Sequence, residues 1–277
     1  GVSRSDSALN PAEGCRCHEF VYMLGPIAGK GLENVTMLKQ DDYKHHISEK
    51  FNLELENLKN QMLEMGGKVE QQLSAAVDAL VRMDSGAAEV VIDSDHAINE
   101  LERKIDEHCA SILALRQPTA SDLRLVMTAV KVNTDLERIG DEAAKIARQA
   151  VRLSEEGSSP SNFIELRHIG NHVAMMLRQS LDALARYDVT TAVAVVKDDS
   201  TVDREYGSAL RSLMTFMMED PRHIGSIINE MWALRSLERI GDHASNIAEQ
   251  VIYLVHGFDV RHGHLGDVPD RLLQQSE

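Results

Sequence analysis

The sequence LERIGD occurs twice, at residues 136–141 and at residues 237–242. Extending the comparison eight residues beyond each copy gives ten identities in 14 positions. Two proline-containing turns, at Pro118 and Pro221, lie 103 residues apart, close to the 101-residue spacing of the motif. A repeated spacing of this length indicates an internal duplication, so the fold must be one that a single chain can build twice.

Each half of the chain reads as three amphipathic helices. Apolar residues recur at intervals of three or four from Ile47 onward, which is the period of a helix with one buried face. No segment alternates apolar and polar residues as a half-buried strand would. We therefore predict an all-α fold of two tandem three-helix bundles. The expected helices cover about 47–83, 91–115, 119–153, 163–187, 191–218 and 224–256.

The first 43 residues differ from the rest because they are rich in Gly and lack a helical period. Met37 is a candidate natural start, which would make residues 1–36 an upstream-translated or vector-derived segment. A Cys15-Arg-Cys17-His18 stretch lies there, but it has no second ligand pair, and we predict that it is incidental. The predicted domains are an extension (1–43), a first repeat (44–156), a second repeat (157–262) and a tail (263–277).

Composition narrows the class of function. The chain is 43% hydrophobic but only 4% aromatic, which predicts an aliphatic core. Its net charge of −15 argues against nucleic-acid binding and favours cations, metals included, or a basic partner surface. Three cysteines cannot build a disulfide framework, and no apolar run approaches the roughly 18 residues of a membrane span. We expect a cytoplasmic protein with no membrane insertion.

The repeated motif is expected to lower helix stability, so its presence in both copies needs an explanation. Glu137 and Asp141 are i and i+4 on one helix, as are Glu238 and Asp242 in the second copy. Like charges at this spacing destabilise a helix by a few tenths of a kcal/mol, and an interior Gly costs roughly 1 kcal/mol relative to Ala. A cation held by carboxylates from two helices would offset both effects. The missing Gly side chain would let a neighbouring helix approach closely.

The competing explanation is a solvated charged face. In the first copy, Arg138 can pair with Glu142 and Asp141 with Lys145, both at i+4. The second copy weakens this explanation, because Asn246 stands four residues after Asp242 and Leu234 four residues before Glu238. The acid pair persists where its lysine does not, which favours metal binding.

A polar stripe runs along the helix that precedes each motif. In the first repeat it falls at i, i+4, i+7 and i+11: Asp95, Asn99, Glu102 and Asp106. In the second repeat Asp199 and Asp203 occupy the first two positions, and Tyr206 replaces the Glu. Such a stripe alone is typical of a solvent face, but its duplication beside LERIGD makes its residues candidate ligands.

Histidines carry a weaker signal. A ferritin-like di-iron enzyme needs Glu-x-x-His on two helices, and only Glu165-Leu-Arg-His168 matches. His168 and His172 at i and i+4 are more typical of an exposed or core-satisfied pair than of a metal site. We expect no role for the tail histidines His262 and His264.

Taken together, these residues carry a family resemblance. RQPTASDLRLVMTAVKVNTDLERIGDEAAKIAR (116–148) and LRSLERIGDHASNIAE (234–249) resemble the PhoU family of bacterial phosphate-signalling accessory proteins. Residues 46–73 look like the family's opening helix, and 202–222 like the turn of its second repeat. The resemblance covers roughly 45–262.

The resemblance implies a fold of two three-helix bundles and a metal site at each Glu/Asp-x-x-x-Asp motif. Glu137/Asp141, Glu238/Asp242 and Asp199/Asp203 match that motif, whereas Asp95/Asn99 departs from it. Iron, zinc, manganese and magnesium all remain open as the metal. If one half holds metal more firmly, we predict that it is the second.

The resemblance further implies a non-enzymatic negative regulator of the phosphate-starvation response. The expected partners are the ATPase subunit of the phosphate ABC transporter and the phosphate sensor histidine kinase, at the inner membrane through these partners, with a homodimer by analogy. Two alternatives stay open: a carboxylate-bridged di-metal enzyme in a helical bundle, and a structural scaffold in which LERIGD only packs.

Overall fold

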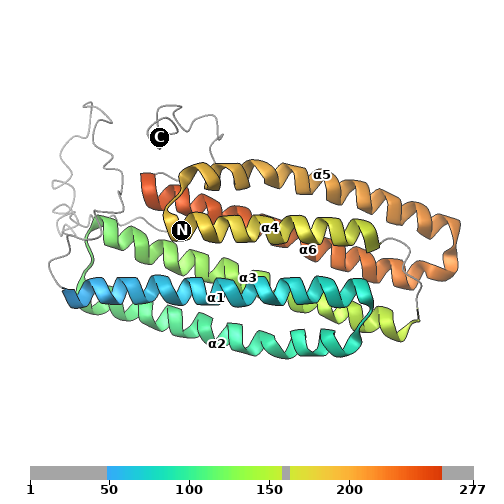
Figure 1. The fold of residues 1–277 in the computed structure, drawn as a ribbon, viewed down its shortest axis with the longest axis horizontal. Coiled ribbons are helices and arrows are strands. Elements are labelled where there is room, and N and C mark those ends of the chain that lie inside the picture. The colour runs from blue at the N-terminus through green and yellow to red at the C-terminus, as the bar shows by residue number, and fades with distance from the viewer. Residues whose placement is uncertain (1–48, 158–162, 258–277) are drawn as a thin grey trace, which may run out of the picture. The chain divides into compact units, whose positions relative to one another are not determined.

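The computed structural model describes residues 49–157 and 163–257, and no strand occurs among them. The first repeat contains α1 (Glu49–Arg82), α2 (Ser85–Arg116) and α3 (Ala120–Glu155) (Figure 1). The second contains α4 (Phe163–Arg186), α5 (Val189–Glu219) and α6 (Ile224–His256), with a short 3₁₀ turn, η2 (Pro221–His223), leading into α6. The all-α prediction is confirmed. Residues 1–43 and 263–277 lie outside the described residues, so the predicted domain boundaries stay predictions.

The turn between the first two helices is built alike in both repeats. Met83 and Tyr187 adopt left-handed backbone conformations, with φ of 53° and 57°. The next residues, Asp84 and Asp188, each accept a hydrogen bond from the backbone N–H three residues later, at 3.0 and 3.1 Å. Such a cap satisfies a backbone donor that the first helical turn leaves unpaired. Helix α2 therefore begins at Ser85, earlier than the start at about 91 that the apolar period predicted.

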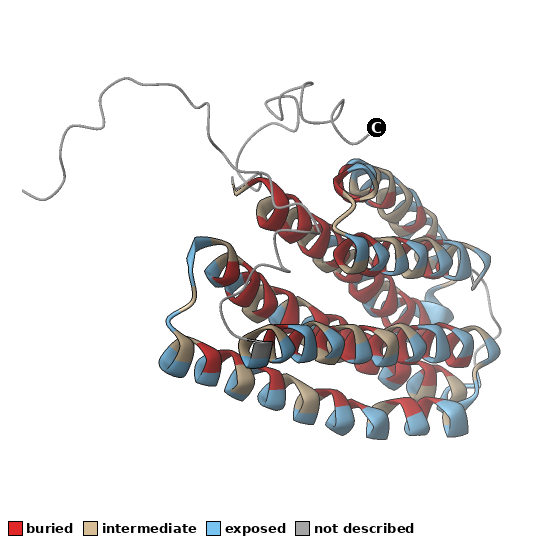
Figure 2. Cartoon of the chain, turned by 60° about the vertical axis from the view of Figure 1, so that its left-hand side comes forward, coloured by how far each residue is buried: buried red, intermediate tan, exposed pale blue. Residues whose placement is uncertain are grey.

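An aliphatic core holds each bundle together. Helix α3 packs against α1 and α2, and α6 packs against α4 and α5. Buried faces turn towards neighbouring helices and exposed faces turn outwards (Figure 2). Leu58, Met62, Ile105, Leu136 and Ile146 are among the largest fully buried side chains. Burying one such side chain contributes roughly 1.5–3 kcal/mol, so the apolar ladders account for the assembly of the helices.

The two repeats contact each other through α3 with α6 and through α1 with α4. Glycines permit the α1–α4 contact. A Cβ at Gly66 would lie 2.6 Å from Leu181 Cδ2, and one at Gly170 would lie 2.8 Å from Val77 Cγ1. The two contacts are reciprocal, because each helix offers a glycine to an apolar side chain of the other.

Candidate metal centre

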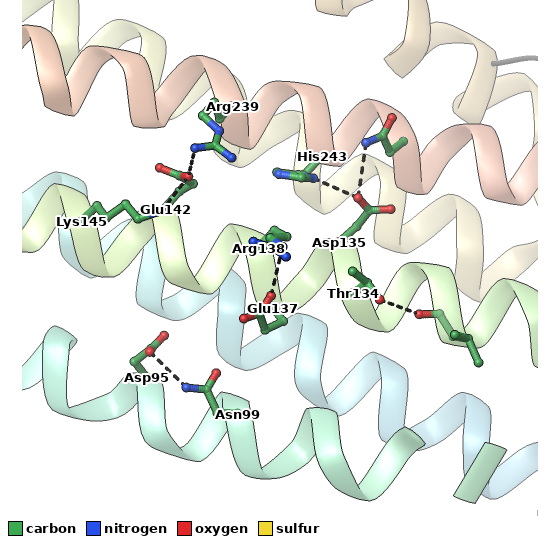
Figure 3. A network of polar contacts seen from close by, with 12 residues as sticks. Asp95, Asn99, Thr134, Asp135, Glu137, Arg138, Glu142, Lys145, Arg239 and His243 are labelled. Carbon is green, nitrogen blue, oxygen red and sulfur yellow. Dashed lines mark hydrogen bonds and ion pairs between the residues drawn. The ribbon is translucent and has the colours of Figure 1, made fainter. Parts of the chain in front are cut away.

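The first acid cluster lies between α2 and α3 (Figure 3). Asp95, Asn99 and Glu102 come from α2, and Glu137 and Asp141 come from α3. Asp95 is buried and the other four are half-buried. Burial raises the pKa of Glu137, and the charges of Asp141, Glu102 and Asp95 raise it further. The structure thus places the predicted acids of this repeat near one another.

Two carboxamides hold Asp95. Gln72 Nε2 donates to Asp95 Oδ1 and to the Val91 carbonyl, both at 3.4 Å, and Asn99 Nδ2 donates to Asp95 Oδ2 at 3.3 Å. The amide oxygens, Gln72 Oε1 and Asn99 Oδ1, are buried with no hydrogen-bond partner among the described residues. Amide oxygens are ordinary ligands of hard cations.

Sequence reasoning missed Gln72, which lies on α1. Its signal was a polar residue inside an apolar ladder, between Val69 and Leu73. Gln72 is only 5% exposed, and buried polar side chains are usually fixed by a specific partner.

The second acid cluster lies between α5 and α6. Ligand atoms of Asp203, Glu238 and Asp242 fall within 4.8 Å of one another, the one such group of three or more metal-ligating side chains in the described part of the chain. Glu238 Oε2 is buried without a hydrogen-bond partner among these residues. This is a carboxylate-only donor set, which suits hard cations such as magnesium, manganese and iron.

The second cluster is electrostatically crowded. Burial, together with the charges of Asp242, Asp203 and Glu238, raises the pKa of Asp199 to about 6. Burial and neighbouring acids likewise raise the pKa of Glu238 and of Asp242. A bound cation would offset the repulsion among these carboxylates and lower their pKa values, because it favours the ionised form of every acid around it.

Each motif glycine lies where a neighbouring helix comes close. A Cβ at Gly140 would lie 3.2 Å from Gln72 Oε1 and 3.3 Å from Ile98 Cδ1. A Cβ at Gly241 would lie 3.3 Å from Val202 Cγ1 and 3.8 Å from Asp199 Oδ1. The expected close approach at these glycines is confirmed.

The salt bridges predicted from helical spacing were wrong in the first copy. Glu142, which is 2% exposed, lies 3.0 Å from Lys145 Nζ and 2.8 Å from Nη1 of Arg239 on α6 (Figure 3). Arg138 Nε lies 3.5 Å from Glu137 Oε2 instead of pairing with Glu142. The buried Glu142 thus pairs with two basic side chains, and one of them, Arg239, lies across the α3–α6 contact. Helical spacing within α3 alone does not predict this pair.

The charge environment of the second copy also differs from the prediction. Arg235 Nη1 lies 2.6 Å from Glu238 Oε1. Glu238 therefore has a basic partner three residues before it, although the residue four positions before it is the apolar Leu234. Asn246 donates to Asp135 Oδ1 at 3.3 Å, and His243 Nδ1 contacts the same oxygen at 2.9 Å (Figure 3). Among the residues that the structure describes, Arg235 is thus the basic side chain that pairs with an acid of the second cluster.

The cysteine and histidine stretches set aside in the sequence, Cys15, Cys17, His18, His262 and His264, lie outside the described residues. The remaining candidate ligands are distributed as the duplication predicts, on the second and third helices of each repeat. The residues present fit an oxygen-liganded cation in both repeats, on the strength of the orphaned amide oxygens in the first repeat and the clustered carboxylates in the second.

Comparisons with known proteins agree with the duplication. The PhoU domain matches the chain twice, over residues 62–150 and 166–251. A phosphate-specific transport system accessory protein PhoU homolog from Pseudomonas aeruginosa is 58% identical over 226 residues, covering 82% of this chain and 93% of that protein. The Escherichia coli accessory protein PhoU is 48% identical over 228 residues, covering 82% of this chain and 94% of that protein.

Solved structures show the same fold. The crystal structure of PhoU from Pseudomonas aeruginosa superposes with a TM-score of 0.74, at 58% identity, over 75% of this chain and 100% of that one. The phosphate transport system regulatory protein PhoU from Streptococcus pneumoniae gives a TM-score of 0.70 at 32% identity, over 76% of this chain and 99% of that one. With both repeats matched and relatives of this identity spanning most of its length, the chain belongs to the PhoU family.

Proposed function

We propose that this protein is a non-enzymatic accessory regulator of phosphate transport, which represses the phosphate-starvation response and restrains phosphate uptake when phosphate is plentiful. The observation that carries the proposal is the 48–58% identity, across both repeats, to proteins named as accessory to the phosphate-specific transport system. The Streptococcus pneumoniae neighbour is named a regulatory protein of that system, which supports a regulatory role.

In this proposal the protein is a cytoplasmic adaptor. It contacts the ATPase subunit of the phosphate ABC transporter and the cytoplasmic part of the sensor histidine kinase, as a homodimer at the inner membrane. The net charge of −15 supports a basic partner surface. None of the helices in the described residues has the length and apolar character to span a membrane.

The metal is part of the proposal. Asp199, Asp203, Glu238 and Asp242 would hold it in the second repeat. In the first repeat the ligands would be Asp95, Asn99, Glu102, Glu137 and Asp141. When bound, the cation would neutralise the crowded acids and fix the spacing of the second and third helices. The all-oxygen donors favour magnesium, manganese or iron over zinc, which usually takes nitrogen or sulfur ligands.

The di-metal enzyme alternative has no specific support. A ferritin-like centre takes a histidine from each of two helices. His243 is the histidine nearest in sequence to the second acid cluster, and it pairs with Asp135 at 2.9 Å. We therefore retain the regulatory proposal alone.

A gene deletion tests the regulatory role. A phosphate-starvation reporter should become active in phosphate-rich medium when the gene is deleted, and the wild-type gene on a plasmid should silence it. A reporter that stays silent in the deletion strain would contradict the proposal. Direct binding of the purified protein to the ATPase subunit and to the kinase's cytoplasmic portion tests the adaptor role separately.

A further inference from the structure

A third cluster of ligating side chains lies between α4 and α5, and it shares no residue with either acid cluster. His168 and His172 come from α4, and Asp198 and Glu205 come from α5. Glu205 and Asp203 are two residues apart on a helix, so their side chains leave α5 about 200° apart, on opposite faces. Asp203 belongs to the acid cluster beside α6, whereas Glu205 contacts both histidines of α4.

One carboxylate joins the two imidazoles. His168 Nε2 lies 3.2 Å from Glu205 Oε1, and His172 Nδ1 lies 2.9 Å from Glu205 Oε2. Two nitrogens and a carboxylate bound to one cation at about 2.0–2.2 Å also lie roughly 3 Å apart. Each of the two histidine–carboxylate contacts thus has the separation that a nitrogen and an oxygen ligand of one ion have. Two histidines at i and i+4 on one helix face are a spacing that zinc sites use.

Asp198 contacts the second ring nitrogen of His172 and can orient that histidine as a metal ligand. His172 Nε2 lies 2.9 Å from Asp198 Oδ2, while its Nδ1 faces Glu205. A metal-bound histidine usually donates its other ring N–H to a carboxylate, which fixes the tautomer and the ring orientation. His172 is oriented in this way before any cation is present.

A rotation of the His168 side chain would complete the site. Among the described residues, this cluster does not bring three ligand atoms within 4.8 Å of one another, and the two imidazole centroids are 6.5 Å apart. The His168 side chain is 68% exposed, so its ring can turn towards His172 at small cost. A cavity of about 250 Å³ beside it is lined by His168, Glu205 and Ser208, which leaves room for water as a fourth ligand.

We propose that His168, His172 and Glu205 form a binding site for a late first-row divalent cation of the Zn²⁺ class, with Asp198 orienting His172. Imidazole ligands suit Zn²⁺, Ni²⁺ and Cu²⁺, whereas the acid clusters offer only oxygen. The cation clamps α4 to α5 on the side of α5 opposite the second acid cluster. The site is independent of the proposed regulatory function, because it shares no residue with the acid clusters.

Zn²⁺ and Co²⁺ binding to the full-length protein test this site. Zn²⁺ affinity is measured against a chromophoric chelator, and the visible absorption of bound Co²⁺ reports nitrogen ligation. The wild type should bind one equivalent that His168→Ala weakens at least tenfold, with loss of the Co²⁺ bands. His168 is exposed, so this variant should fold, and helical circular dichroism checks that it does. His96→Ala, which removes an exposed histidine of α2, is the matched control and should leave binding unchanged.

Two further variants locate the ion. Asp198→Asn should weaken Zn²⁺ by roughly 10–100-fold while leaving one equivalent at saturation, as expected for a residue that orients a ligand. Glu238→Gln/Asp242→Asn should retain the histidine-dependent equivalent. Wild-type affinity and Co²⁺ absorption in His168→Ala would overturn the proposal, as would loss of that equivalent in the acid-cluster variant alone.

Discussion

In the first repeat Asp95 accepts hydrogen bonds from the amides of Gln72 and Asn99, whereas in the second repeat Asp199 faces Asp203, Glu238 and Asp242. The residue 104 positions after Gln72 is Met176, and the one after Asn99 is Asp203. The duplicated backbone therefore presents two different electrostatic environments. The first cluster is partly satisfied by its own amides, and the second depends more strongly on a cation or a proton.

Replacing Gln72 with the residue of the second repeat should have the largest effect. Gln72→Met removes the amide that bonds to Asp95 and to the Val91 carbonyl, and so takes away the donor to the buried Asp95 Oδ1. We expect the metal-free protein to lose about 1–3 kcal/mol of unfolding free energy. Urea denaturation in a chelating buffer measures this loss. Met176→Leu, a volume-conserving change in the second repeat, is the control and should cost less than about 1.5 kcal/mol. Equal losses would show that Gln72 only fills space.

Exchanging one side chain between the repeats should shift metal affinity. Asn99→Asp gives the first cluster the acid of the second and should tighten divalent cation binding there about tenfold, because it adds a charge to the ligand set. Asp203→Asn should weaken the second cluster by a similar factor. Isothermal titration with Mn²⁺ measures both. Affinity changes in the opposite directions, or unchanged affinity in both variants, would contradict the proposed difference between the repeats.

Stability without metal should depend on pH through Asp199. Its pKa is raised from 3.8 to about 6, so between these values the folded chain holds a proton that the unfolded chain releases. Stability from this group is complete below about pH 4 and is lost as pH rises through 6. Asp199→Asn should therefore stabilise the metal-free protein at pH 7 by on the order of 1 kcal/mol, after a discount for partial exposure.

Denaturant midpoints between pH 4.5 and 7 check this dependence. The Asp199→Asn variant should show a flatter profile than the wild type. Asp93→Asn, on an exposed position of α2, is the control and should follow the wild type. A wild-type slope that persists in Asp199→Asn would assign the pH dependence to other groups.

The smallest predicted effect is the difference in stability between alanine variants at the two motif glycines. Ala for Gly gains up to about 1 kcal/mol of helix propensity, which crowding opposes. At Gly140 the new Cβ would meet the ends of Gln72 and Ile98, which can shift, so we expect little net change. At Gly241 it would meet Val202, whose β-branched side chain is stiff in a helix. We expect Gly241→Ala to lower stability by about 1 kcal/mol, and thermal unfolding of both variants measures the difference.

The helices and the duplication were predictable because they rest on local rules. The apolar period predicted the helix ends to within about two residues, except for the start of α2, and the spacing of LERIGD related the repeats. Helix α2 begins at Ser85 instead of the predicted 91, because the cap Asp84 acts through a side-chain bond that the apolar period does not register.

Contacts between helices were harder to predict. Arg239 reaches Glu142 across the α3–α6 contact, and Gln72 reaches Asp95 from a helix that carries no motif. Glu205 joins His168 and His172, which looked incidental by themselves. Each pairing depends on how separate helices pack and rotate against each other, and helical spacing within one segment contains no information about that.

Metal content most directly tests the central claim that the duplicated acid clusters bind cations and that the second binds more firmly. The wild type, Glu137→Ala/Asp141→Ala and Glu238→Ala/Asp242→Ala are purified without chelator or histidine tag and analysed by inductively coupled plasma mass spectrometry. We predict bound metal in the wild type and a larger loss from the Glu238/Asp242 variant than from the Glu137/Asp141 variant. A metal-free wild type, unchanged metal in both variants, or the larger loss from the first repeat would contradict the account.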